Sequence, residues 1–232
     1  MRTFIIGDIH GHDAKLAALL EKMRPDPRTD ALILLGDLFD RGPDAWAVFR
    51  RVQALEEAFR ERFTLLMGNH EDYLLSETKS LAMELTWIRQ GKLASVRSFR
   101  ANGADMKDCR LWFRQHCRTY VCGEGFQCAH AGVRVVPIEA NDRDTLVHDH
   151  GCVFENLYAG PLTVTGHVAV DAPCWFTGDG QTVERLPYGL WRPLPDRGVV
   201  CIDTGCGKGG WLTGMRIEAT DGAPSFLLYR AE

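Results

Sequence analysis

The sequence of 232 residues lacks a long hydrophobic run. Its first apolar stretch, Phe4 to Ile6, stops at Gly7, far short of a signal-peptide core or of the roughly 20 apolar residues of a membrane-spanning helix. We therefore expect a protein that stays in the cytoplasm and has no membrane among its partners.

The sequence also lacks blocks of charge of one sign. Its 27 basic and 31 acidic residues are interspersed and give a formal net charge of -4. A surface for nucleic acid or for acidic lipid needs clustered positive charge. We therefore expect no nucleic acid polymer as a partner.

The eight cysteines form no CxxC pair and no regular framework. With 45% hydrophobic residues, a chain of this length can bury a large core without cross-links. We therefore expect the cysteines to be small buried hydrophobes in a reducing compartment. The composition predicts one catalytic domain over residues 1–232.

The first third of the chain alternates between strand and helix patterns. Short apolar runs predict strands at 2–6, 31–35 and 63–67. Apolar side chains at helical spacing predict helices over 13–23 and from Pro43 to about 60. This alternation is typical of βαβ units with a parallel sheet.

The remainder of the chain divides into a helical part and a mostly β part. Residues 72–118 show helical periodicity and no strong strand signal, and we predict that they form a helical insertion or cap. The later apolar runs are separated by Gly and Pro turns, and long loops are expected at 134–160 and 187–198. Strands are predicted at 119–122, 126–129, 162–165, 182–186, 199–202, 212–218 and 225–229.

Polar side chains follow five of the predicted strands. The loops read GDIHG at 7–11, GDLFDRG at 36–42 and GNHE at 68–71, and His130 and His167 each follow a later apolar run beside a small residue. The carboxyl ends of strands are where ligands bind in open α/β sheets. A mixed set of imidazole and carboxylate ligands suits manganese, iron or zinc better than magnesium or calcium.

In this order the segments GDIHG, GDLFDRG, GNHE, HAG and GH resemble the phosphoprotein phosphatase branch of the calcineurin-like metallophosphoesterases. The similarity spans residues 7–167 and implies an α/β (α+β) fold, a four-layer β-sandwich flanked by helices, with a helical insertion. It also implies a pair of divalent metal ions, with manganese expected and iron or zinc as alternatives. The implied metal ligands are Asp8 and His10 for the first ion, Asp37 as the bridge, and Asn69, His130 and His167 for the second.

Two metals about 3.5 to 4 Å apart can share a hydroxide and direct it at phosphorus. His70 can protonate the leaving group if Asp40 orients it, and the resemblance implies the same pair. The fork of Arg41 can bind phosphate oxygens, and Asn69 is expected to contact the substrate as well.

The sequence departs from this family pattern in one place. Members commonly carry a second phosphate-binding arginine between the last two metal histidines, but residues 145–150 read TLVHDH. Its replacement stays open among Arg134, Arg143, His148 and His150. The later segment Asp203-Thr204-Gly205 lacks the GK[ST] ending of a phosphate loop, and we predict that it is a turn.

The sequence thus predicts a metal-dependent phosphoester hydrolase acting on a phosphorylated protein or a nucleotide. The main expectation is a serine/threonine protein phosphatase that uses a metal-activated hydroxide. One alternative is a symmetrical dinucleoside polyphosphate hydrolase, because sequences of this size also resemble diadenosine tetraphosphatases. A second alternative, raised by the missing arginine, is an inactive docking module for a phosphorylated partner.

Overall fold

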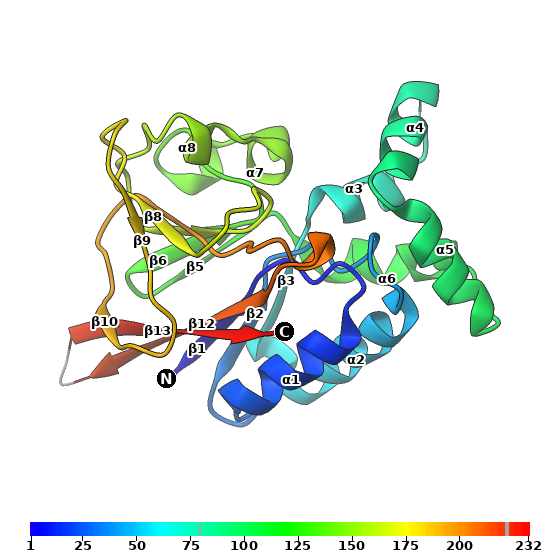
Figure 1. The fold of residues 1–232 in the computed structure, drawn as a ribbon, viewed down its shortest axis with the longest axis horizontal. Helices are drawn as coiled ribbons and strands as arrows, with labels where there is room; N and C mark the ends of the chain where they lie inside the picture. Colours follow the sequence, from blue (N-terminus) through cyan, green and yellow to red (C-terminus); the bar gives the residue numbers. More distant parts are fainter. Residues whose placement is uncertain (79, 221–222) are drawn as a thin grey trace.

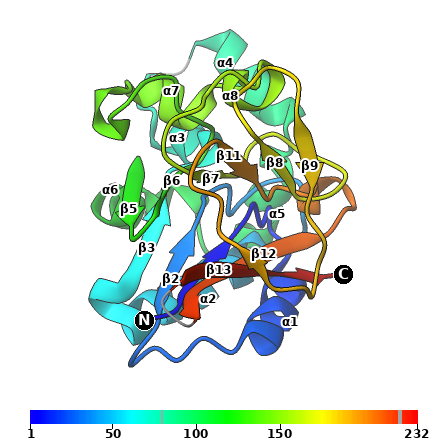
Figure 2. The same cartoon turned by 90° about the vertical axis from the view of Figure 1, so that its left-hand side faces the viewer.

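The computed structural model describes residues 1–78, 80–220 and 223–232 and contains two β-sheets. One sheet has seven strands in the order β10-β13-β12-β1-β2-β3-β4, and the other has six in the order β5-β6-β7-β11-β8-β9. Figure 1 shows α1 and α2 below the sheets and α7 and α8 above them, and Figure 2 shows the same layers from the side. The mixed α/β fold with two sheets and outer helices is as the sequence predicts.

The first third of the chain has the predicted strands and helices, and β1, β2 and β3 are parallel. The helix predicted from Pro43 begins later, at Ala45. The N–H of Asp44 donates to the carbonyl of Gly11, so the residues just before this helix hold the loop after β1 instead of starting a turn. The elements are β1 Thr3–Ile6, α1 Asp13–Met23, β2 Ala31–Leu34, α2 Ala45–Phe59, η1 Arg60–Arg62 and β3 Phe63–Leu66.

Helices occupy most of the described part of the segment predicted to be helical, residues 72–118, of which residue 79 lies outside the described residues. In Figure 1, α4 and α5 project to the right of the sheets. The role of this segment as an insertion or cap stays a prediction. The elements are α3 Asn69–Leu75, α4 Leu81–Arg89, α5 Lys92–Ala101, η2 Met106–Cys109, α6 Arg110–His116 and β4 Cys117–Arg118.

The second half is mostly β, and each predicted strand overlaps an observed one. The prediction of a long loop over 134–160 is wrong in part, because three short helices lie in it. The side chain of Asp142 caps the second of them by accepting from the N–H of Thr145, and six residues are too few for a clear periodicity. The strands are β5 Tyr120–Gly123, β6 Phe126–Ala129, β7 Thr163–Thr165, β8 Cys174–Phe176, β9 Val183–Arg185, β10 Arg192–Pro193, β11 Val199–Cys201, β12 Leu212–Thr220 and β13 Ala223–Ala231, and the helices are η3 Ile138–Ala140, α7 Arg143–His148, α8 Gly151–Phe154 and η4 Cys206–Lys208.

The core follows the two-residue period of the strands. In β1, Ile5 joins the cluster between the two sheets, and its neighbours Phe4 and Ile6 belong to the cluster that includes the outer helices. Ile33 of β2 and Val200 of β11 also join the cluster between the sheets. The sheets therefore stack through alternate side chains, and the loops at their strand ends meet above this core.

The described helices include none with the length and apolar character that crossing a bilayer requires. All eight cysteines are free, and six of them are buried.

Candidate metal centre

Most of the predicted ligands converge on one buried carboxylate, that of Asp37 after β2. His10 and His70 lie on one side of it, and His130 and His167 on the other. In each group the candidate ligand atoms lie within 4.8 Å of one another, and Asp37 belongs to both groups. This is the position in which one carboxylate can be shared by two cations.

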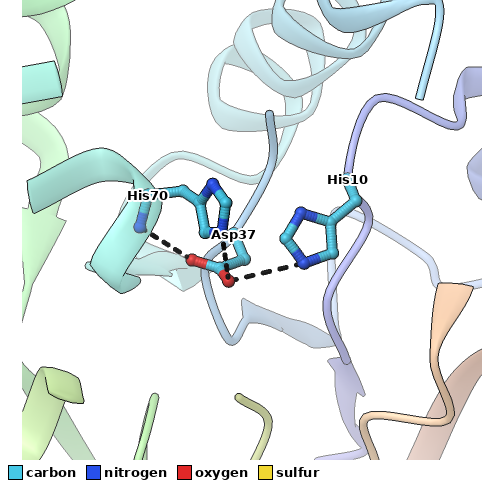
Figure 3. A group of neighbouring side chains, drawn as sticks. All are labelled: His10, Asp37 and His70. Carbon is cyan, nitrogen blue, oxygen red and sulfur yellow. Dashed lines mark hydrogen bonds and ion pairs between the residues drawn. The ribbon is translucent and has the colours of Figure 1, made fainter. Parts of the chain in front are cut away.

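Each oxygen of the Asp37 carboxylate lies close to at least one imidazole nitrogen. Its Oδ2 lies 3.5 Å from Nε2 of His10 and 3.8 Å from Nε2 of His70, and its Oδ1 lies 3.5 Å from Nε2 of His130. Figure 3 shows the imidazoles of His10 and His70 around this carboxylate, with the backbone N–H of His70 donating to it. Burial acts to raise the pKa of Asp37, but the surrounding histidines outweigh burial and hold this pKa far below its usual range.

Hydrogen bonds from Nδ1 to backbone carbonyls fix the ring orientation of two histidines. Nδ1 of His10 donates to the carbonyl of Phe39, and Nδ1 of His130 donates to that of Leu35, each over 2.8 Å. Because a carbonyl only accepts, Nδ1 carries the proton and the lone pair of Nε2 faces the centre. Burial lowers the pKa of both rings, which keeps them neutral, as metal ligands must be.

Asn69, His167 and Asp8 complete the predicted set. Oδ1 of Asn69 lies 3.3 Å from Nε2 of His130 and 3.0 Å from Nδ1 of His167. The N–H of His167 donates to Oδ2 of Asp8 over 3.0 Å. Burial, with the nearby His130, lowers the pKa of His167 to about 3. All six predicted ligands therefore lie at one place in the fold.

Three buried polar atoms at this place have no hydrogen-bond partner in the described chain: Oδ1 of Asp8, Nε2 of His167 and Oδ2 of Asp203. Burial, followed by the charges of Asp203 and Asp37, raises the pKa of Asp8 well above its ordinary value. Buried polar atoms are rarely left without a partner, and clustered carboxylates repel one another. Bound cations would satisfy these lone pairs and relieve this repulsion, so the residues present fit a pair of divalent ions.

Asp203 was not among the predicted site residues. It follows β11, and its carbonyl accepts from the N–H of Val170, so the loop after β11 runs beside the loop after β7. Burial, with the charge of Asp37, raises the pKa of Asp203 to about 6. The sequence carried the same signal as at the other loops, an apolar run that ends in Asp beside a glycine-containing turn. Because the segment Asp203-Thr204-Gly205 is interpreted from the sequence as a turn, Asp203 is not among the predicted ligands.

Backbone strain is concentrated at the centre. Non-glycine residues adopt a positive φ at eight described positions, and five of these belong to the predicted site. Such conformations cost energy and persist where the surroundings enforce them. The five are His10 at 48°, Asp37 at 49°, Asp40 at 70°, Arg41 at 66° and His167 at 65°.

Two glycines allow the ligand loops to approach one another. A Cβ at Gly68 would lie 2.1 Å from Oδ1 of Asp37, and one at Gly166 would lie 2.0 Å from Oδ1 of Asp8. Any larger residue would displace these carboxylates.

His70 and Asp40 form the predicted hydrogen bond, with Nδ1 2.6 Å from Oδ2. Burial acts to lower the pKa of His70, but Asp37 and Asp40 outweigh it and the pKa is raised. The carboxylate of Asp40 also accepts from Nε1 of Trp87 over 2.5 Å and from the hydroxyl of Ser95 over 2.8 Å. Helices α4 and α5 therefore hold this pair in place.

Glu71 links two of the ligand loops. Its buried carboxylate accepts from the N–H groups of Asp37 at 2.7 Å, Leu38 at 2.9 Å and Gly68 at 3.0 Å. Burial and the charge of Asp37 raise its pKa to about 7. The GNHE motif contains this residue, but its structural role was not predicted.

Arg41 also lies at the centre, as predicted. Its Nη1 is 2.6 Å from Nε2 of His10, and its Nη2 is 3.4 Å from Nε2 of His70. The guanidinium thus places positive charge beside the ring nitrogens that face Asp37.

Three of the four candidates for the missing arginine are held by carboxylates. Arg134 pairs with Asp149 at 2.8 Å and with Glu155 at 2.7 Å. Arg143 and His148 share Asp72. We call residues 134–155 the ion-paired segment.

The fourth candidate, His150, has a different setting within that segment. Its ring centroid lies 4.4 Å from that of His167, and its ring stacks on Phe154. Of the four candidates, it alone has a ring contact with a predicted metal ligand.

Comparisons with known proteins agree with this geometry. Residues 1–191 match the family described as calcineurin-like phosphoesterase. A Klebsiella pneumoniae protein named "Bis(5'-nucleosyl)-tetraphosphatase, symmetrical" is 45% identical, and the alignment covers 94% of this chain and 92% of that protein. An Escherichia coli protein of the same name is 43% identical, with the same coverage of both chains.

Solved structures support the fold. A crystal structure provisionally described as a diadenosine tetraphosphatase superposes with a TM-score of 0.64 at 19% identity, covering 100% of this chain and 94% of that one. A metallophosphoesterase from Sphaerobacter thermophilus gives 0.62 at 13% identity, covering 100% and 90%. With the ordered loops, the shared buried carboxylate and these matches, the chain belongs to the calcineurin-like phosphoesterases, hydrolases that use divalent metal ions.

Proposed function

We propose that this chain hydrolyses a dinucleoside tetraphosphate at its central P–O–P linkage. Water adds to one of the two inner phosphorus atoms, the bridging bond breaks, and two nucleoside diphosphates leave. The observation that carries this proposal is the name of the full-length relatives, symmetrical bis(5'-nucleosyl)-tetraphosphatase, at 45% identity over 94% of the chain. The alternative expectation from the sequence is therefore favoured over the serine/threonine protein phosphatase.

We assign the first metal to Asp8, His10 and Asp37, and the second to Asp37, Asn69, His130 and His167, because these residues surround the buried atoms that have no partner. Asp203 is placed to support the first metal beside Asp8. The mixed nitrogen and oxygen donors suit manganese, with iron or zinc as alternatives. A bound metal pair would lower the pKa of water and polarise the phosphoryl oxygens.

The other residues of the centre position the substrate and manage its protons. His70, held by Asp40, is the proton donor to the departing oxygen, because its Nδ1 is engaged and its Nε2 faces Asp37. Arg41 and Asn69 bind the oxygens of the phosphoryl group that is attacked. A protein with this acid and metal set in place is expected to turn over substrate and not merely to dock it.

The test is a direct comparison of substrates under manganese. The purified protein is given diadenosine tetraphosphate and a phosphoserine peptide, and the products are separated by chromatography. We expect ADP as the only nucleotide product, formed with a kcat/KM well above that for the peptide. ATP and AMP as products, or faster release of phosphate from the peptide, would overturn the proposal.

A further inference from the structure

A cavity of about 430 Å³ lies beside Arg41, and none of its lining residues is acidic. One wall is the end of α4 with the turn into α5, and the other is η4. This volume is within the range of roughly 300–1,000 Å³ found for small-ligand sites. We call it the cationic cavity, and its lining residues are Arg41, Arg89, Gln90, Gly91 and Lys208.

Both walls of the cationic cavity are packed against Arg41. Gly91 has a φ of 105°, and a Cβ there would lie 2.4 Å from the backbone nitrogen of Arg41. A Cβ at Gly207 would lie 2.7 Å from Cδ of Arg41 and 2.7 Å from Cδ2 of His10. Arg89 lies two residues before Gly91, and Lys208 follows Gly207, so the backbone that carries these two residues is held at a fixed place relative to the metal centre.

The charges of this cavity are not balanced within it. Arg89 and Lys208 are exposed, and no ion pair joins either one to a described residue, although the charges of Arg41 and Lys208 act on the buried carboxylate of Asp203. Arg134 and Arg143, in contrast, are paired with carboxylates. Cations gathered around a hollow without a carboxylate repel one another, and this arrangement favours an anionic ligand.

We propose that the cationic cavity binds the phosphate groups of a polyphosphate chain that lie beyond the phosphoryl group attacked at the metal centre. Arg41 stands between the two, since it contacts His10 and lines the cavity. A phosphomonoester would end at Arg41, whereas a polyphosphate would continue to Arg89 and Lys208. These two residues then supply the second cationic contact that residues 145–150 lack. The identification of the polyphosphate as a dinucleoside tetraphosphate rests on the proposed function.

The experiment measures inhibition and does not require nucleotide cleavage. The manganese-loaded protein hydrolyses p-nitrophenyl phosphate, and inhibition constants are measured for orthophosphate, pyrophosphate and tripolyphosphate at constant free metal. For the wild type we expect the inhibition constant to fall by at least about 10-fold from orthophosphate to tripolyphosphate, because charge-assisted contacts are added with each phosphate. For Arg89→Gln/Lys208→Gln we expect this gain to be lost.

The matched control is Arg97→Gln/Lys107→Gln, which removes the same charge from exposed positions outside the cationic cavity. It should keep the gain, and both double variants should keep the orthophosphate constant within about 2-fold. A gain that persists without Arg89 and Lys208, or an equal weakening of all three inhibitors, would overturn the cavity proposal. Failure to split diadenosine tetraphosphate would instead overturn the proposed function, since the inhibitor series can succeed without that reaction.

Discussion

The metal centre and the ion-paired segment both contain charged and polar side chains, but they differ in whether those side chains have hydrogen-bond or ion-pair partners. At the centre, Asp8 and His167 keep buried polar atoms without a partner. In the ion-paired segment, Arg134 is held by two carboxylates, and Arg143 is held by Asp72. The difference teaches that unmet bonding capacity, and not the presence of charge, marks the place where a ligand binds.

Backbone conformation separates the two regions in the same way. His10, Asp37 and His167 have a positive φ, whereas no residue of the ion-paired segment does. Strain of this kind costs of order 1–3 kcal/mol per residue and is kept where the surroundings enforce it. Of these two regions, only the centre therefore carries backbone strain of this kind.

The change with the largest expected effect is Asp37→Asn at the centre. An amide offers one oxygen where the carboxylate offers two, so the shared position between the two metal groups is lost. We expect manganese content, measured by elemental analysis after desalting, to fall by half or more, and hydrolysis to fall to background. Full metal content with retained turnover would show that Asp37 is not the bridge.

His70→Asn should have the next largest effect, and its size should depend on the leaving group. For phenyl phosphate, whose phenol has a pKa of about 10, we expect turnover to fall roughly 10²- to 10⁴-fold. For a dinucleoside tetraphosphate the departing phosphate has a pKa of about 6, so the loss should be smaller. Equal losses on the two substrates, with metal content unchanged, would contradict the role of proton donor.

The sequence located most of the centre because Asp8, His10 and Asp37 each follow an apolar run and lie beside a glycine. That signal is local, and the parallel order of the strands brings its carriers together. Asp203 carried the same signal but was compared only with a phosphate loop. Apolar runs also predicted most strands of both sheets, but β4, β8 and β10 were missed, because strands of two or three residues carry too short a pattern.

The contacts to Asp40 could not be predicted in this way. Trp87 is 47 residues and Ser95 is 55 residues away from it in sequence. Their meeting depends on how α4 and α5 fold over the loop after β2, which no local pattern encodes. The short helix α7 was missed for a different reason, because it depends on a single capping side chain, Asp142.

Trp87→Phe tests whether the helical segment belongs to the centre. The substitution removes the indole N–H that donates to Asp40 and keeps an aromatic ring. We expect kcat to fall by about 10-fold with KM little changed, as for other residues that orient a functional group. The matched control is Trp112→Phe, since Trp112 packs on Phe113 and His116 in the same segment. An equal loss in both variants would reduce the role of Trp87 to packing.

Arg143→Ala should have the smallest effect and tests the other side of the comparison. Arg143 is half-exposed, and its partner Asp72 also bonds to His148, so the carboxylate keeps a partner when the arginine is removed. We expect a stability loss of at most about 1 kcal/mol by chemical denaturation. Turnover of diadenosine tetraphosphate should stay within about 2-fold, since a paired surface arginine contributes little. A fall of about 10-fold or more, the cost of a lost charge-assisted contact, would place Arg143 on the substrate and end the distinction between the two regions.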